Sequence, residues 1–326
     1  MTSVERTRPG LWLQWASFWD GYDRTTLRIG LCLAAGLELL VECSQVAWQS
    51  RDLAHYRKGG ALAGALVQVP GAAWILFGLI AIGLAHVAVD RRPVLAGLWT
   101  LLWAAVLSEW QTQIFGSPSR NAFFPGAALL GWVLGQAWAR ELDRGAGGSS
   151  RANRERIGEA GALACIAAAY VGSCASKLVA TGGAWADGMQ VRALIVRQQP
   201  LVQWPILLDW RDAIIDSPAL AAASATATLV IEGGAFLLLF GPRLRATWAV
   251  ALIGLHTSIL LLCTMPYLEP MVLLGLLALP WPQLTRKRRI LDDAEFDSTG
   301  LPWRMLAVLT GLVALAWLLA PWGWRG

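Results

Sequence analysis

Long apolar runs separated by short polar stretches make up most of the chain. A helix needs about 20 mostly apolar residues to cross the hydrocarbon core of a bilayer. Nine runs reach or approach this length, at residues 25–47, 70–89, 93–115, 122–139, 157–180, 218–240, 246–264, 268–280 and 301–320. The run at 268–280 is the shortest and contains Pro270, so it is either a short span or a re-entrant segment. The pattern predicts an all-α, polytopic transmembrane helical bundle with eight or nine spans.

The composition excludes a soluble globular protein. Of the 326 residues, 56% are hydrophobic and only 15% are charged, whereas charged residues make up about 25% of a typical soluble domain. The mean hydropathy is +0.49, which also excludes a disordered chain. The net charge of +5 is the small difference between 27 basic and 22 acidic residues, and most of the basic residues lie in short loops between apolar runs. We therefore expect the lipid bilayer, and not nucleic acid, as the partner.

The charges of the loops predict an orientation. Cytoplasmic loops of membrane proteins are richer in lysine and arginine than outer loops. With nine spans and the segment 1–24 in the cytoplasm, sixteen lysines and arginines fall in cytoplasmic segments and eight in outer segments. The first run is not a cleaved signal peptide, because polar residues precede it and because it contains Arg28 and Glu38. These features predict a multi-pass plasma-membrane protein with a cytoplasmic N-terminus.

The segments between the runs differ in character. Residues 140–156 include Gly-Ala-Gly-Gly-Ser-Ser and are expected to form a flexible cytoplasmic loop. Residues 181–217 form the one long outer segment, and the mixed apolar and polar residues around 189–197 predict a short helix in the outer interface. Residues 286–300 are a basic cytoplasmic loop, and 301–326 contain the last predicted helix and the tail.

Three residue types carry weaker signals. The five cysteines lie in apolar runs without a Cys-x-x-Cys pair or a histidine at metal-ligand spacing, so we expect buried core residues and no metal site. Several tryptophans lie near predicted span ends, as in an aromatic belt; they include Trp48, Trp110 and Trp138. Glycines such as Gly126, Gly131 and Gly233 are expected to let helices approach closely.

The charged residues within the spans are the candidate functional residues. Such charges are expensive in a membrane and usually face a protein interior or a water-filled cavity. Glu38 and Glu42 are four residues apart and share one helix face. With Lys177, Glu109 and His256, they are expected to converge on one cavity in the outer half of the bilayer, and Glu232 lies in the middle of its span.

The same residues can also have purely structural roles. Lys177 can extend its ammonium group to the outer interface. Glu232 and His256 can form a structural hydrogen bond between helices. Arg28 is close enough to the cytoplasmic end of its span to anchor it there, and Glu109 is expected at the interface.

A resemblance to a known family rests on short motifs in a fixed order. The chain reads Tyr170-Val-Gly-Ser-Cys-Ala-Ser-Lys177-Leu178, followed by Trp185-Ala-Asp-Gly188-Met189. This resembles the motif of the horizontally transferred transmembrane (HTTM) domain, the membrane domain shared with vitamin K-dependent gamma-carboxylase. Further matches follow in order at Leu27-Arg28-Ile29, Leu229-Val-Ile-Glu232, Pro242-Arg243 and Leu255-His256. The resemblance covers residues 25–285 and implies an all-helical membrane domain with an outward-facing reaction chamber.

The resemblance also implies roles for residues. Lys177 corresponds to the catalytic base that activates a reduced quinone, with His256 and Glu232 as orienting or proton-relay groups. Trp185 and Gly188 would shape the chamber wall, and Glu38, Glu42 and Arg28 would line the cavity. A lysine out of water gives up its proton more readily and can then act as a base. The stretch 119–125, where the carboxylase carries a further catalytic histidine, contains none here.

Three functions are compatible with these observations. The first is a carboxylase-like, quinone-linked modifying enzyme that acts on a lipophilic or secreted peptide substrate at the outer leaflet. The second is a non-catalytic maturation or partner protein for a secreted peptide, similar to the sporulation-delaying-protein maturation factor. The third, a transporter, is disfavoured because the sequence has no inverted repeat and no paired broken helices.

Overall fold

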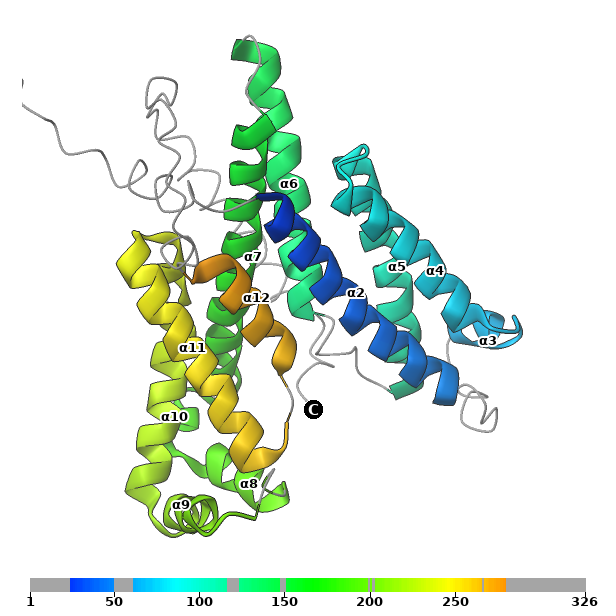
Figure 1. The fold of residues 1–326 in the computed structure, drawn as a ribbon. Helices are drawn as coiled ribbons and strands as arrows, with labels where there is room; N and C mark the ends of the chain where they lie inside the picture. Colours follow the sequence, from blue (N-terminus) through cyan, green and yellow to red (C-terminus); the bar gives the residue numbers. More distant parts are fainter. Residues whose placement is uncertain are drawn as a thin grey trace, which may run out of the picture.

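The computed structural model describes residues 24–49, 61–115, 123–146, 151–198, 200, 203–265 and 267–279. Every regular element in these ranges is a helix (Figure 1). The elements are α2 (Arg24–Gln49), α3 (Ala61–Val67), α4 (Ala72–Ala88), α5 (Pro93–Phe115), α6 (Phe123–Ala146), α7 (Arg151–Thr181), η2 (Ala184–Asp187), α8 (Met189–Arg197), α9 (Pro205–Asp216), α10 (Pro218–Gly233), η3 (Gly234–Leu239), α11 (Pro242–Cys263) and α12 (Leu268–Ala278). The segment 1–23, the loop 286–300 and the predicted span 301–320 lie outside the described residues.

The helices confirm the predicted all-α architecture. Five helices in the described part are long and apolar enough to cross a membrane: Leu27–Trp48, Pro93–Ile114, Arg154–Thr181, Pro218–Leu239 and Arg243–Cys263. α4 and α12 are apolar but shorter. α12 has 11 residues, so at 1.5 Å per residue it is only about half as long as the hydrocarbon core is thick. The chain is thus a helical protein suited to a membrane, while the count of eight or nine spans and the orientation stay predictions.

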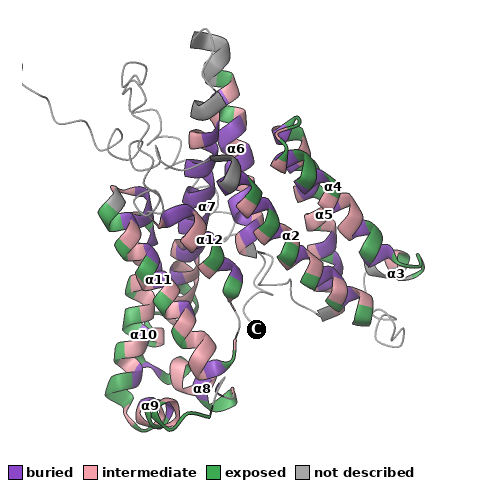
Figure 2. Ribbon diagram, viewed as in Figure 1, coloured by how far each residue is buried: buried purple, intermediate pink, exposed green. Residues whose placement is uncertain are grey.

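Helix α7 is the centre of the bundle. Its residues 160–170 are all buried, most of them alanine or another small residue. Figure 2 shows α7 mostly in the buried class, with exposed residues on the outward faces of α2, α4, α10 and α11. A helix that is apolar and buried on all sides is typical of the core of a large bundle.

Glycines bring α6 and α7 into backbone contact. A Cβ atom added to Gly131 would lie 2.1 Å from the carbonyl oxygen of Gly161, and one added to Gly161 would lie 2.1 Å from the carbonyl oxygen of Gly131. The predicted packing role of glycine is confirmed at Gly131. It is wrong at Gly126, because an added Cβ atom there would meet nothing within 4 Å.

A buried ion pair connects three helices at one end of the bundle. The guanidinium group of Arg28 in α2 donates a hydrogen bond to the carbonyl oxygen of Ala88 at 3.1 Å, at the end of α4. It also forms an ion pair with Glu155, near the start of α7, and both side chains are less than 10% exposed. Arg28 therefore anchors α2 to the neighbouring helices.

The polar connections are more helical than the sequence indicates. The loop expected over 140–156 is mostly wrong, because α6 continues to Ala146 and α7 begins at Arg151. Arginine, glutamate and leucine after residue 139 are strong helix formers, so only the glycine-rich part lies outside the described helices. The predicted short helix around 189–197 is confirmed as α8. The sequence analysis did not predict α9, although Pro205 at its first turn is a typical helix start.

Apolar side chains cover the outward surface of the bundle. Leu37 is 64% exposed and Val250 is 60% exposed, which fits contact with lipid. Trp48 is 70% exposed, as expected for an aromatic belt, but Trp110 is only 1% exposed and packs in the core, so its place in the belt was wrongly predicted. All five cysteines are buried and free, as expected.

Gly131→Ala is expected to destabilise the bundle, because the added methyl group collides with the backbone of α7. Overpacking of this kind costs about 1–3 kcal/mol. The measurement is SDS-induced unfolding in mixed micelles, followed by circular dichroism. Gly126→Ala, on the same helix but facing open space, is the matched control and should unfold at or above the wild-type SDS fraction. Equal midpoints for the two variants would contradict the backbone contact.

Candidate functional site

Lys177 and Glu232 form an ion pair between α7 and α10. The ammonium group of Lys177 donates hydrogen bonds to both carboxylate oxygens of Glu232, at 2.5 Å to Oε1. The side chains are 19% and 9% exposed. Glu232 is the fifteenth residue of α10, about 21 Å along the helix axis from its start. Glu232 therefore lies well inside a candidate span, while Lys177 lies four residues before the end of α7 and its ammonium group is bound by Glu232. The extension of Lys177 to the outer interface stays a prediction.

The span that carries Glu232 changes its helix type directly after this residue. The α-helix α10 ends at Gly233, and the 3₁₀-helix η3 begins at Gly234. The indole of Trp248 in α11 donates a hydrogen bond to the carbonyl oxygen of Ile231 at 2.9 Å, in the last turn of α10. A short 3₁₀ stretch within a long helix often marks a functional hinge. Glu232 thus stands at the end of a helix, where partial negative charge also favours the lysine cation.

The two glycines after Glu232 make this break possible. A Cβ atom added to Gly234 would lie 2.1 Å from the indole of Trp248, and one added to Gly233 would lie 3.1 Å from the sulfur of Cys174. Both α7 and α11 therefore pack closely against the break. The sequence analysis predicted that Gly233 lets helices pack closely, and this prediction is confirmed. It did not predict the change of helix type.

The turn after α7 places an indole over the lysine. The ammonium nitrogen of Lys177 lies 5.3 Å from the ring centroid of Trp185, which is cation–π geometry. The hydroxyl of Thr181 donates to the carbonyl of Lys177 at 2.8 Å and accepts from the backbone N–H of Trp185 at 3.0 Å. The indole Nε1 of Trp185 is buried and has no hydrogen-bond partner among the described residues. It is therefore a polar position that a ligand oxygen can satisfy.

Gly188 fixes this turn against α10. Its φ angle is +82°, in the left-handed region that favours glycine. A Cβ atom added to Gly188 would lie 2.3 Å from the carbonyl carbon of Ala221. Gly188 thus lets the turn touch the α10 backbone and hold Trp185 over the lysine.

His256 pairs with a tyrosine from the central helix. Its Nε2 atom lies 2.7 Å from the hydroxyl oxygen of Tyr170 in α7, so the predicted hydrogen bond between Glu232 and His256 is wrong. The rings of Phe124 and Tyr267 lie beside them, at centroid distances of 4.8 Å from Tyr170 and 5.5 Å from His256, respectively. The Nδ1 atom of His256 is buried without a hydrogen-bond partner in the described part of the chain.

Electrostatic interactions connect the two pairs. The positive charge of Lys177 acts on the imidazole of His256, and the negative charge of Glu232 acts on the hydroxyl of Tyr170. The structure therefore places the three residues predicted to be catalytic, Lys177, Glu232 and His256, in one neighbourhood. Lys177 contacts Glu232 directly, whereas no hydrogen bond joins His256 to either of them among the described residues.

The carboxyl groups of α2 form an adjoining cluster. Glu42 accepts a hydrogen bond from the amide of Gln111 in α5. Glu38 interacts electrostatically with Glu42 and with Glu269, at the start of α12. Glu269 also acts on Tyr170, so this cluster reaches the tyrosine–histidine pair. The sequence analysis missed Glu269 because it lies at the edge of a short apolar run.

Two other predicted residues lie apart from the cluster. Arg28 is ten residues before Glu38 on α2, about 15 Å along the axis, and is engaged by Glu155. Glu109 is exposed and accepts a hydrogen bond from Gln113 on its own helix at 2.7 Å.

Two buried arginines were counted as loop charges in the sequence. Arg211 in α9 donates to the carbonyl oxygens of Ile195, Gln198 and Leu262, and so ties α8, α9 and the end of α11 together. Arg245 in α11 is completely buried and donates to the carbonyl oxygen of Leu238 at 2.9 Å. For Arg245 the apolar neighbours Leu244 and Ala246 were the available signal, whereas Arg211 lies between Trp210 and Asp212 and had no such signal. Both arginines stabilise the bundle and lie outside the candidate site.

No family model matches the chain, and neither a curated protein nor a solved structure matches it. The resemblance to the HTTM domain therefore rests on the motif residues themselves. The structure shows where those residues lie: Lys177, Trp185 and Gly188 form one continuous unit against α10.

Removing one partner of the Lys177–Glu232 pair is expected to destabilise the protein strongly. Lys177→Met leaves a buried carboxylate and Glu232→Met leaves a buried ammonium, each at a cost of about 3–5 kcal/mol. The double variant Lys177→Met/Glu232→Met should recover most of this loss, because no charge is left unpaired. SDS unfolding midpoints of the three variants measure the coupling. Glu109→Gln, which changes an exposed glutamate, is the control, and additive effects of the two single changes would argue against the ion pair.

Proposed function

We propose that the chain is a multi-pass inner-membrane protein that uses Lys177 as a general base on a lipophilic or secreted peptide substrate at the outer leaflet. The observation that carries the proposal is the Lys177–Glu232 pair, which joins two candidate spans and is covered by Trp185. A buried charge at membrane depth is expensive and is usually kept for function. The side chain of Lys177 also keeps 19% of its surface exposed, so a reactant has access to it.

Glu232 gives the lysine a route to its basic form. The proton moves along the existing hydrogen bond from Nζ to a carboxylate oxygen, and the ion pair becomes a neutral amine beside a carboxylic acid. A low dielectric favours such neutral pairs compared with water. The neutral amine then takes a proton from the substrate, and Glu232 gives its own proton to the product before the product leaves, which restores the ion pair. Arginine cannot take this role, because its guanidinium group stays protonated.

A reduced quinone suits the residues around Lys177 and around His256. Its flat ring suits the aromatic groups of Trp185, Tyr170, Phe124 and Tyr267. Its oxygens suit the two buried nitrogens without partners, Trp185 Nε1 and His256 Nδ1. When bound, such a quinone supplies an acidic hydroxyl and two electrons, and the chain supplies the proton acceptor.

His256 supports a carboxylase-like function, although the sequence lacks one histidine of the carboxylase motif. The stretch 119–125 lacks the histidine of the carboxylase. Phe124, at the end of this stretch, has its ring centroid 6.4 Å from that of His256. α11 therefore brings an imidazole next to Phe124, at the end of the stretch that lacks the histidine, which supports a proton-relay role for His256.

A surface observation supports the second function, binding of a secreted peptide without catalysis. Apolar side chains are exposed on α8 and α9, which lie across one end of α10 and α11 (Figure 1). They are Met189, Val196, Trp204, Ile206 and Trp210, each more than half exposed. Such a surface suits an interfacial position or an apolar peptide.

Substitution of Lys177 separates the two functions. Lipid extracts and secreted peptides of bacteria that produce wild type, Lys177→Arg or Lys177→Met are compared by mass spectrometry. If Lys177 is a base, a product that depends on the wild-type chain falls at least about 100-fold with either substitution. If the lysine is only a cation in a binding site, Lys177→Arg retains the product.

The controls are the amount of protein in the membrane and the variant Glu109→Gln, whose product level should equal that of wild type. Identical extracts from cells with and without the wild-type chain would overturn the catalytic proposal.

A further inference from the structure

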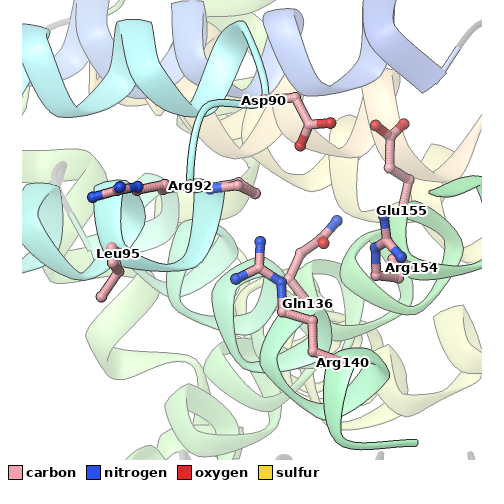
Figure 3. A pocket seen from close by; sticks show the side chains of 8 residues that line it. Asp90, Arg92, Leu95, Gln136, Arg140, Arg154 and Glu155 are labelled. Carbon is pink, nitrogen blue, oxygen red and sulfur yellow. The ribbon is translucent and has the colours of Figure 1, made fainter. Parts of the chain in front are cut away.

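A second site lies at the other end of the bundle from α8 and α9. A pocket of about 420 Å³ opens between the α4–α5 turn, α6 and the start of α7. In Figure 3, Arg92 and Arg140 lie on one side of this space, and Asp90 and Glu155 lie on the other. The pocket contains none of the residues of the Lys177 site, so it is independent of the proposed function.

The charges around the pocket favour an anion. Three arginines line it, Arg92, Arg140 and Arg154, together with the carboxylates of Asp90 and Glu155. Glu155 is neutralised from outside the pocket by the ion pair with Arg28. With Arg28 counted, four guanidinium groups face two carboxylates, which leaves a local charge of +2. Guanidinium groups are well suited to phosphate, because they offer paired N–H donors in one plane.

The turn that forms one wall is strained. Asp90 and Arg92 have φ angles of +59° and +48°, and both are residues other than glycine. Residues in this region are kept where the surrounding structure needs them, often at binding sites. With this backbone conformation, the four-residue connection between α4 and α5 brings both Asp90 and Arg92 to the pocket.

An apolar track leads from the pocket along α5. Leu95 lines the pocket and is 61% exposed. Leu98 and Leu102 follow at helical spacing on the same face and are 49% and 56% exposed. A ligand with a phosphate head and an acyl chain can therefore place the head among the arginines and the chain along these leucines. Basic pockets between membrane helices bind anionic lipid head groups in this manner.

We propose that this pocket binds the phosphate group of an anionic phospholipid, with one acyl chain lying along Leu95, Leu98 and Leu102. With the orientation predicted from the loop charges, this end of the bundle faces the cytoplasmic leaflet. The shared chemistry, a phosphate group held by arginines, also suits a soluble phosphate ester, and the experiment distinguishes the two sources.

Native mass spectrometry of the full chain, released from detergent micelles, measures bound lipid. Phosphatidylglycerol should bind to wild type at least about tenfold more tightly than phosphatidylcholine. The double variant Arg92→Gln/Arg140→Gln should lose this preference, while the matched variant Arg192→Gln/Arg197→Gln on α8 should keep it. Arg92 is exposed, so its substitution leaves the core intact, and an unchanged circular dichroism spectrum verifies the fold.

Two results would overturn the proposal. One is equal binding of phosphatidylglycerol and phosphatidylcholine by wild type. The other is displacement of phosphatidylglycerol by millimolar glycerol 1-phosphate, which would show that the site takes a soluble phosphate ester. The variant Leu98→Ser tests the acyl track. It should weaken the binding of phosphatidylglycerol, which has an acyl chain, and leave any binding of glycerol 1-phosphate, which has none, unchanged. A head-group site without the acyl track would show no effect of this substitution.

Discussion

Pairing of buried charges between helices is the constraint on which the rest of this bundle depends. A charge out of water is costly unless an opposite charge or several hydrogen bonds compensate it. Arg28 meets Glu155 across more than 120 residues of sequence, and Lys177 meets Glu232 across 55. Each pair joins helices whose apolar surfaces alone do not specify one arrangement, since lipid is as apolar as the helix faces.

Both ion pairs join a cation on one helix to a carboxylate on another, but the two cations differ in how readily they can give up a proton. Arg28 is 3% exposed and bound on both sides, and its guanidinium group keeps its proton. Lys177 is 19% exposed, lies under an indole and pairs with a carboxylate that can accept its proton. The first pair therefore serves the architecture. The second also stabilises the bundle, and only this pair can take part in proton transfer.

Helix α7 connects the two ends of the protein. Arg154 and Glu155 near its start line the basic pocket, and Tyr170 and Lys177 nearer its end form the candidate site. Small residues between them let α6 and α10 pack against the same helix, through Gly161 on one side and Cys174 on the other. The close contacts at these small residues thus position the charged groups, and the ion pairs in turn hold the helices together.

The sequence by itself determined the helical membrane character, the positions of most helices and the short helix α8. These follow from local patterns, because apolar runs of sufficient length have no stable alternative to a helix in a bilayer. It also indicated Lys177, Glu232 and His256, because charges within apolar runs are rare. Only the tertiary structure decided their partners. Glu232 pairs with Lys177 and not His256, Glu269 joins the α2 carboxylates, and Trp110 packs inside. These outcomes depend on which helix faces meet, and the helical period alone cannot specify that, because most of these helices are apolar on all sides.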